Sequence, residues 1–187
     1  SWTRTISGQA MASTVTVTAP VIAGYHIGFA RDADGNELTL GGANNNEVQI
    51  TLDSNQSGKN AVSFSYVADT VKYTIEYLND RQDISKYPGV LISETYTYTD
   101  AAGYERTLNR GDIIPSVELT GTVASTAFAT ALDVAGYSPT APTFQKQLSA
   151  DPADNIIRVW YSPKTDISYT VEYFNIDQDR KLIDKQV

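Results

Sequence analysis

The stretch Tyr73-Thr74-Ile75-Glu76-Tyr77-Leu78 returns almost unchanged as Tyr169-Thr170-Val171-Glu172-Tyr173-Phe174, ninety-six residues later. In both copies Tyr, Ile or Val alternates with Thr and Glu, which is the period-2 pattern of a strand with one buried and one solvated face. Each copy follows an aromatic, strand-like run, VSFSY at 62–66 and IRVWY at 157–161. The sequence therefore predicts a repeat in which the last strand of one module leads into the first strand of the next.

The composition favours β structure and excludes some classes of partner. The chain of 187 residues has 12 Tyr against 5 Phe and 2 Trp, and Tyr, like Val, Ile and Thr, favours half-buried pleated surfaces. The formal net charge is −8 at pH 7, whereas phosphate backbones are bound by clustered Lys and Arg. No apolar run reaches the roughly 18 residues that span a bilayer. We therefore expect neither nucleic-acid binding nor membrane insertion by this segment.

Signatures of metal sites and enzymes are not found in the sequence. Cysteine is absent and His26 is the single histidine, so thiolate sites are excluded and imidazole ligation is not expected. Asp32-Ala33-Asp34-Gly35-Asn36-Glu37 is similar to the start of a calcium loop, but the twelfth position is Ala43, and a tight hairpin turn is the better interpretation. No Gly-x-Ser-x-Gly or His-Glu-x-x-His motif occurs. We expect no catalytic residue, no metal and no cofactor.

The tripeptide Arg110-Gly111-Asp112 matches the integrin-binding sequence. Glycine permits a positive φ angle and an aspartate side chain accepts hydrogen bonds from its neighbouring backbone, so the same residues suit a structural turn. The turn is the preferred interpretation.

Other patterns predict the remaining elements. Alternating or apolar runs predict strands at 14–18, 47–52, 62–66, 90–92, 94–99, 117–120 and 157–161. The Ala-rich segment 125–134 spaces Phe128, Ala131 and Leu132 at helical intervals. Ser125 stands where an N-cap would lie and Gly136 where a C′ residue would lie, so the sequence predicts a short helix there.

The two units align with two constant offsets. The segment from Ser13 to Gly24-Tyr25 matches that from Ser125 to Gly136-Tyr137 at an offset of 112, and the closing strands match at 95. The first unit therefore carries about seventeen extra residues, where the Asp-Gly hairpin lies. We interpret 1–67 as the later part of a variant module, 70–163 as a whole module and 167–187 as the start of a third. The links between these modules are only a few residues long, so we expect monomeric modules that follow one another closely, end to end.

The ordered motifs resemble those of the MucBP (mucin-binding protein) repeat. They are the Tyr-Thr-Ile-Glu-Tyr start at 73–77, the Gly-Asp pair at 111–112, the Gly-Tyr pair at 136–137 and the closing strand 157–161. The resemblance covers 73–161, with 169–187 as a fragment and 13–66 more loosely. It implies a mainly β (α+β) fold of tandem β-grasp, ubiquitin-like modules, each a small mixed sheet with one short helix. The chain departs from the pattern in its long segment 80–108 and at 175–179, which lacks the turn glycine.

The resemblance implies a tandem-repeat segment of a Gram-positive surface adhesin, extracellular and anchored to the cell wall through regions outside this segment. Such a segment is expected to bind host mucin or other glycoprotein glycans. The candidate ligand-binding residues are Tyr96, Tyr98 and Tyr104, because flat aromatic faces with polar rims suit sugar rings. Cross-strand packing is the alternative role of these tyrosines. The alternative function is a stalk whose repeats bind nothing and project a distal adhesive domain.

Overall fold

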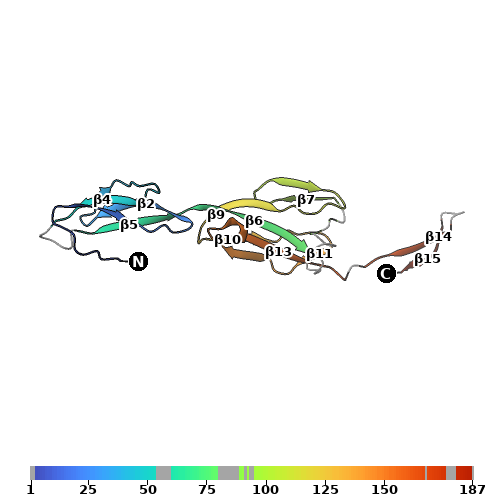
Figure 1. Cartoon of the computed structure of the whole chain (residues 1–187). Helices are drawn as coiled ribbons and strands as arrows, with labels where there is room; N and C mark the ends of the chain where they lie inside the picture. The colour runs from blue at the N-terminus through green and yellow to red at the C-terminus, as the bar shows by residue number, and fades with distance from the viewer. Residues whose placement is uncertain are drawn as a thin grey trace. The chain divides into compact units, whose positions relative to one another are not determined.

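The computed structural model describes residues 3–53, 60–79, 89–90, 92, 95–166, 168–175 and 180–186. The chain is mainly β, in small mixed sheets (Figure 1). In order, its elements are β1 (Thr14–Thr18), β2 (Tyr25–Asp32), β3 (Glu37–Leu38), β4 (Glu47–Thr51), β5 (Val62–Ala68), β6 (Thr70–Asn79), β7 (Tyr96–Thr99), β8 (Glu105–Leu108), β9 (Val117–Thr122), β10 (Thr126–Thr130), β11 (Tyr137–Pro139), β12 (Thr143–Gln147), the 3-10 helix η2 (Pro152–Asp154), β13 (Ile156–Pro163), β14 (Val171–Asn175) and β15 (Arg180–Gln186).

The chain divides into two compact units, and the first gathers three separate segments. Unit 1 comprises Ser1–Tyr73, Thr120–Ala127 and Lys146–Asn155. Its sheets are the antiparallel pair β1–β4 and the three strands β3–β2–β5. Ala30 and Val48 are almost fully buried, as alternation with solvated neighbours requires. Two segments that the sequence assigns to the second module, 120–127 and 146–155, thus belong to the same compact unit as the first seventy residues.

Unit 2 contains the four-stranded mixed sheet β11–β13–β6–β9 and comprises Thr74–Leu119, Phe128–Gln145 and Ile156–Val187. At its centre β6 and β13 run parallel, with Ile157 opposite Ile75 and Val159 opposite Tyr77. The core residues Ile75, Tyr77, Ile157, Val159 and Tyr161 are at most 3% exposed. The opening strand of the repeat therefore pairs directly with the closing strand of the same module.

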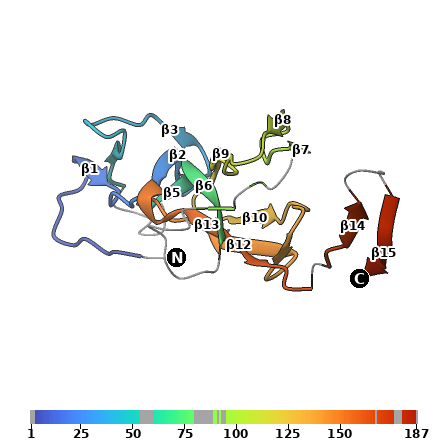
Figure 2. The ribbon, with the colours of Figure 1, turned by 90° about the vertical axis from the view of Figure 1, so that its right-hand side faces the viewer.

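The second copy of the repeated stretch also forms a strand. Residues 171–175 form β14, which pairs antiparallel with β15 (Figure 2). Tyr169 precedes the strand and is 80% exposed. Of the segment 175–179, where the sequence departs from the repeat pattern, only Asn175 lies within the described residues.

The helix predicted at 125–134 is wrong, because Thr126–Thr130 form strand β10, which pairs with β12. Ala127 and Ala129 are buried, whereas Phe128 between them is 58% exposed. Exposed Thr126, Phe128 and Thr130 alternate with the two buried alanines, and that period of two decides the element over the helical spacing of the longer apolar residues. The expected caps serve turns instead: Ser125 Oγ donates to the Thr122 carbonyl (2.6 Å), and Gly136 has a φ of 81°.

The strand predictions at 14–18, 47–52, 62–66, 117–120 and 157–161 are confirmed, and the prediction at 94–99 is confirmed over Tyr96–Thr99. Val90 and Ile92 are buried but lie outside the named strands, and Leu91 lies outside the described residues. Their backbones bond to the 111–114 segment: Ile92 N–H donates to Asp112 (2.9 Å) and Ile114 N–H to Val90 (3.3 Å).

The strand ladders repeat with the same two offsets as the sequence. In the β2–β5 pair, Tyr25, His26 and Ile27 lie opposite Ala68, Val67 and Tyr66. In the β11–β13 pair, Tyr137, Ser138 and Pro139 lie opposite Pro163, Ser162 and Tyr161. Adding 112 to the first strand and 95 to the second converts one ladder into the other. The pairs β1–β4 and β10–β12 correspond with offsets of 112 and 96: the Leu52 N–H donates to the Ser13 carbonyl (3.0 Å) and the Leu148 N–H to the Ser125 carbonyl (2.9 Å).

Candidate functional site

The predicted tyrosines lie on and beside the β7–β8 hairpin, which a single carboxylate closes. Asp100 accepts hydrogen bonds from the backbone N–H groups of Ala102 (3.0 Å) and Tyr104 (2.9 Å) and from Arg106 Nε (2.9 Å). These donors favour the charged carboxylate, so they hold the pKa of Asp100 below its usual value, with the Tyr104 N–H contributing most. Gly103 has a φ of 88°, which the turn needs.

Tyr96 and Tyr98 lie on the same face of β7, as alternation predicts. Their rings stack with centroids 5.3 Å apart and planes 13° from parallel. Tyr98 is only 7% exposed, and its hydroxyl has no hydrogen-bond partner among the described residues. Burial raises the pKa of Tyr98, with the nearby Asp100 carboxylate adding to it. The face of Tyr98 is therefore covered and does not form an open platform for a sugar ring.

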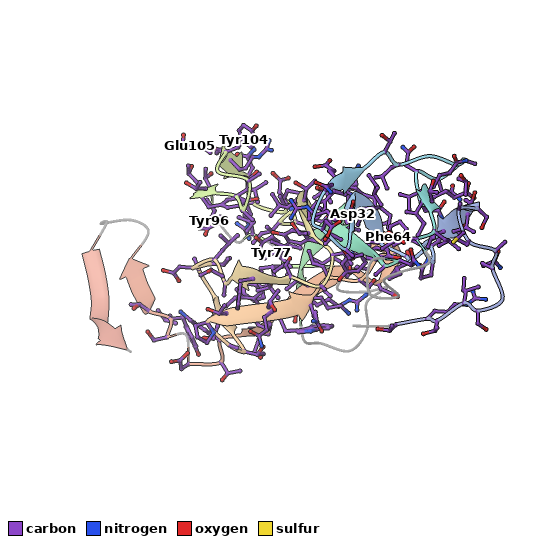
Figure 3. The ribbon with its side chains drawn as sticks, turned by 90° about the vertical axis from the view of Figure 1, so that its left-hand side faces the viewer. Asp32, Phe64, Tyr77, Tyr96, Tyr104 and Glu105 are labelled. Atoms are coloured by element: carbon purple, nitrogen blue, oxygen red, sulfur yellow. The ribbon has the colours of Figure 1, made fainter. Side chains whose placement is uncertain are left out.

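Tyr104 occupies a different environment, at the turn end of the hairpin. Its side chain is 64% exposed, and the Arg106 guanidinium carbon lies 5.6 Å from the ring centroid. Figure 3 shows Tyr104 beside Glu105 and apart from Tyr96, which pairs with Leu108 at the opposite end of the hairpin. The structure thus brings together two of the three predicted residues and leaves only Tyr104 widely accessible.

Tyr77 on β6 and Tyr161 on β13 complete a buried tyrosine cluster with Tyr96 and Tyr98. Burial is the main cause that raises the pKa of Tyr77 and of Tyr161 to about 12, and neighbouring phenols of the cluster contribute. The Tyr161 hydroxyl accepts from the Leu132 N–H (2.8 Å) and donates to the Leu132 carbonyl (3.1 Å). Alternation marks both as inward-facing, but nothing in the sequence indicates that β7 packs on them.

This cluster predicts loss of stability at alkaline pH. A phenol whose folded pKa is raised from 10.0 to about 12 stabilises the fold below pH 10, and this contribution is lost as the pH rises from 10 through 12. Tyrosinate absorbance at 295 nm should rise in two phases, the later one coinciding with loss of far-ultraviolet circular dichroism. A single phase near pH 10 with unchanged dichroism up to pH 12 would contradict the assignment.

Two substitutions by phenylalanine compare the hydrogen-bonded hydroxyl of Tyr161 with the hydroxyl of Tyr98. Tyr161→Phe leaves the Leu132 N–H and carbonyl unpaired in a buried setting, and we expect it to lower the free energy of unfolding by about 1–3 kcal/mol. Tyr98→Phe removes a buried hydroxyl without a partner among the described residues, so stability should stay unchanged or rise slightly. Urea denaturation followed by tryptophan fluorescence measures both. Equal losses in the two variants would argue against the hydrogen bonding described for Tyr161.

The other candidate motifs form turns. Asp32 Oδ1 accepts from the N–H groups of Asp34 (3.0 Å) and Asn36 (2.8 Å), and Oδ2 accepts from Asn36 Nδ2 (3.0 Å). The carboxylate thus closes the β2–β3 hairpin in the same way that Asp100 closes β7–β8. Gly111 has a φ of 94°, and Asp112 Oδ2 accepts from the Asn109 N–H (2.8 Å). Both observations fit the turn interpretation of each motif.

Among the described residues, no group of three or more His, Asp or Glu side chains is placed to hold a metal ion. In that same part of the chain, no helix is long and apolar enough to cross a membrane.

A second feature, in unit 1, surrounds Asp69, the residue between β5 and β6. The Asp69 N–H donates to the Gly24 carbonyl (2.8 Å), and the Asp69 carbonyl accepts from the Val123 N–H (3.0 Å). The Asp69 carboxylate also contacts His26 Nδ1 at 2.6 Å. The backbone at the link is therefore bonded on both sides.

Close packing around Gly24 accompanies these bonds. Gly24 has a φ of 79°, and a Cβ atom built on it would lie 2.8 Å from Ala150 Cβ and 2.9 Å from Val123 Cγ1. Only glycine fits this combination of backbone angle and space. We call Gly24, Asp69, Val123 and Ala150, all within unit 1, the Gly24 joint.

Comparisons of the chain with family models, curated proteins and solved structures found no match.

Proposed function

We propose that the chain is a tandem-repeat segment of a Gram-positive cell-surface adhesin and that its repeats act as a spacer for a distal adhesive domain. The observation that carries this proposal is the Gly24 joint. It ties Gly24 of the first sequence module and Asp69 of the link to turns that the sequence assigns to the second module, at Val123 and Ala150. A spacer needs repeats that contact their neighbours and resist swivelling at the link.

The candidate tyrosines support the spacer over the binding function. A sugar platform needs accessible aromatic faces, whereas Tyr98 is buried and stacked on Tyr96. The carboxylates at the hairpin ends also have hydrogen-bond partners, because Asp32 and Asp100 accept hydrogen bonds from backbone N–H groups of their own turns. These side chains contribute to folding, and no ligand is needed to explain their arrangement.

The spacer proposal predicts a narrow distribution of the distance between two labels placed on either side of the joint within unit 1. Spin labels at Thr16 and Gln147, both exposed, should give a single narrow distance distribution by pulsed electron resonance. Asp69→Pro, which removes the N–H that bonds Gly24, should broaden it. A broad distribution in the unsubstituted chain would contradict the proposal.

Glycan binding is the second candidate function, and the observation that favours it is Tyr104. This ring is exposed and lies next to the Arg106 guanidinium, a pairing that suits a hydroxylated or acidic sugar. Immobilised mucin and a glycan array should ignore the 187-residue chain if it is only a spacer. Retention that disappears in Tyr104→Ala, with unchanged circular dichroism, would establish the binding function instead.

A further inference from the structure

The Gly24 joint has a counterpart in unit 2 that lacks its apolar half. Gly136 has a φ of 81°, close to the 79° of Gly24. The Lys164 N–H donates to the Gly136 carbonyl (2.9 Å) as the Asp69 N–H donates to that of Gly24 (2.8 Å). We call the turns 22–25 and 134–137 the tail turns. Both are closed by the same bond, Tyr25 to Ile22 and Tyr137 to Val134, each 3.1 Å.

The two tail turns differ in what surrounds their glycine. At Gly24 a Cβ atom would meet Ala150 and Val123 within 3 Å. At Gly136 no heavy atom of the described residues, apart from the glycine and its two chain neighbours, lies within 4 Å of that position. The backbone conformation of the two glycines is similar, but among the described residues Gly136 has no counterpart of Val123 and Ala150 packed against it. Gly136 thus has the positive φ of Gly24, and among the described residues the space at its Cβ position is open.

The turn that packs against Gly24 also occurs twice in the chain. We call turns 10–13 and 122–125 the head turns. In each, the serine Oγ donates to the carbonyl three residues back at 2.6 Å. In each, an alanine with positive φ donates to a leucine carbonyl: Ala12 (57°) to Leu52 and Ala124 (64°) to Leu148.

The head turns differ in the exposure of one residue. Val123, which contacts Gly24, is 8% exposed, whereas Met11, its equivalent at the offset of 112, is 68% exposed. A head turn thus buries its apolar residue where a tail turn meets it. Where no tail turn meets it among the described residues, the residue stays in solvent, at a cost of about 25 cal/mol for each Å² left exposed.

We propose that the tail turn at Gly136 and Lys164 is a docking site for the head turn of another repeat of this kind. The docked residue would be a small or β-branched apolar side chain at the position of Val123, placed over Gly136. Its N–H would donate to the Lys164 carbonyl as the Val123 N–H donates to Asp69 (3.0 Å). This bond joins backbone atoms, so the change from Asp69 to Lys164 does not remove it. The inference rests on the proposed spacer function and names the contact by which repeats add.

An extended chain tests the docking directly. It consists of residues 1–164 followed by a second copy of 70–163, which keeps one residue between the joined strands as at Asp69. In the 187-residue chain we expect Gly136→Ala to shift the urea midpoint by the effect of backbone strain alone, as much as Gly103→Ala does, because both glycines have a positive φ and open space at the Cβ position. In the extended chain the shift should approach that of Gly24→Ala, which serves as the calibrating variant.

Amide exchange gives a second readout in the extended chain. The amide of the added copy's Val123 should exchange at least about tenfold more slowly than in a chain that also carries Gly136→Ala. Equal midpoint shifts for Gly136→Ala in the two chains, or an added copy that stays unfolded, would overturn the proposal. The label distances across the Gly24 joint do not involve Gly136, so the spacer function stands or fails separately.

Discussion

Gly24→Ala is expected to destabilise unit 1 by about 2–5 kcal/mol. Two costs combine: an alanine at a φ of 79° is strained by roughly 1–2 kcal/mol, and its Cβ would lie within 3 Å of Ala150 and Val123. Overpacking of that kind costs typically about 1–3 kcal/mol. Chemical denaturation with amide exchange at unit 1 positions measures the loss.

Gly103→Ala is the matched control for this substitution. Gly103 has a φ of 88° but open space around its Cβ position among the described residues. Only the backbone strain should remain, about 1–2 kcal/mol. If both substitutions cost the same, the crowding at Gly24 contributes nothing and the described packing of the joint is incorrect.

Asn155→Ala is expected to cost about 3 kcal/mol. Asn155 is 0% exposed, accepts from the Ser149 N–H (2.8 Å) and donates to the carbonyls of Ser149 (3.0 Å) and Lys72 (3.3 Å). Its removal takes two hydrogen bonds from the half-buried Ser149 backbone, and each buried group left without a partner costs about 1–3 kcal/mol. The loss should appear in equilibrium urea unfolding.

Asn60 offers a matched control, because it occupies the equivalent place in the first module. It accepts from the Asp53 N–H (2.8 Å) and donates to the Asp53 carbonyl (2.7 Å). Asn60 is half-buried, so water can replace these bonds and Asn60→Ala should cost about 1 kcal/mol. A larger loss at Asn60 than at Asn155 would refute the argument from burial.

Period-2 alternation predicted most strands because local sequence and burial agree there. Thr14–Thr18, Glu47–Thr51 and the repeated stretch at 73–78 all alternate apolar and polar residues, and all lie in strands. The Asp-Gly turn after Asp32 could also be predicted, because the residues that form its hydrogen bonds lie within six positions of one another. The result confirms a mainly β chain with small mixed sheets.

The segment 125–134 shows where local reasoning fails. Ala127 and Ala129 are compatible with either period, and Ser125 and Gly136 suit turns as well as helix caps. Pairing with β12, about fifteen residues later, decides for the strand. Tertiary pairing of this kind overrides a short helical pattern, because a helix of that length gains little on its own.

The tyrosines show a second limit. Alternation correctly placed Tyr96 and Tyr98 on one face of a strand, but it does not say which way that face turns. The face turns toward Tyr77 and Tyr161, and this depends on how distant segments pack. Tyr104 stays in solvent because it lies at the turn end of the hairpin, where nothing among the described residues covers it.

The repeat itself was the most informative feature of the sequence, yet the joint was not visible in it. The Gly-Tyr pairs at 24–25 and 136–137 marked equivalent positions, but their role depends on contacts with residues a hundred positions away. The folded chain brings Gly24 next to Val123 and Ala150, which are distant from it in the sequence. Equivalent hydrogen bonds at the two tail turns and the two head turns then reveal the shared design.

The most direct test of the account is nuclear magnetic resonance of the 187-residue chain at the Gly24 joint. We expect a through-hydrogen-bond coupling between the Val123 nitrogen and the Asp69 carbonyl carbon, together with nuclear Overhauser contacts from the Gly24 Hα atoms to the methyl groups of Val123 and Ala150. A Val123 amide that exchanges freely while the β6 amides stay protected, with no contact to Gly24, would contradict it.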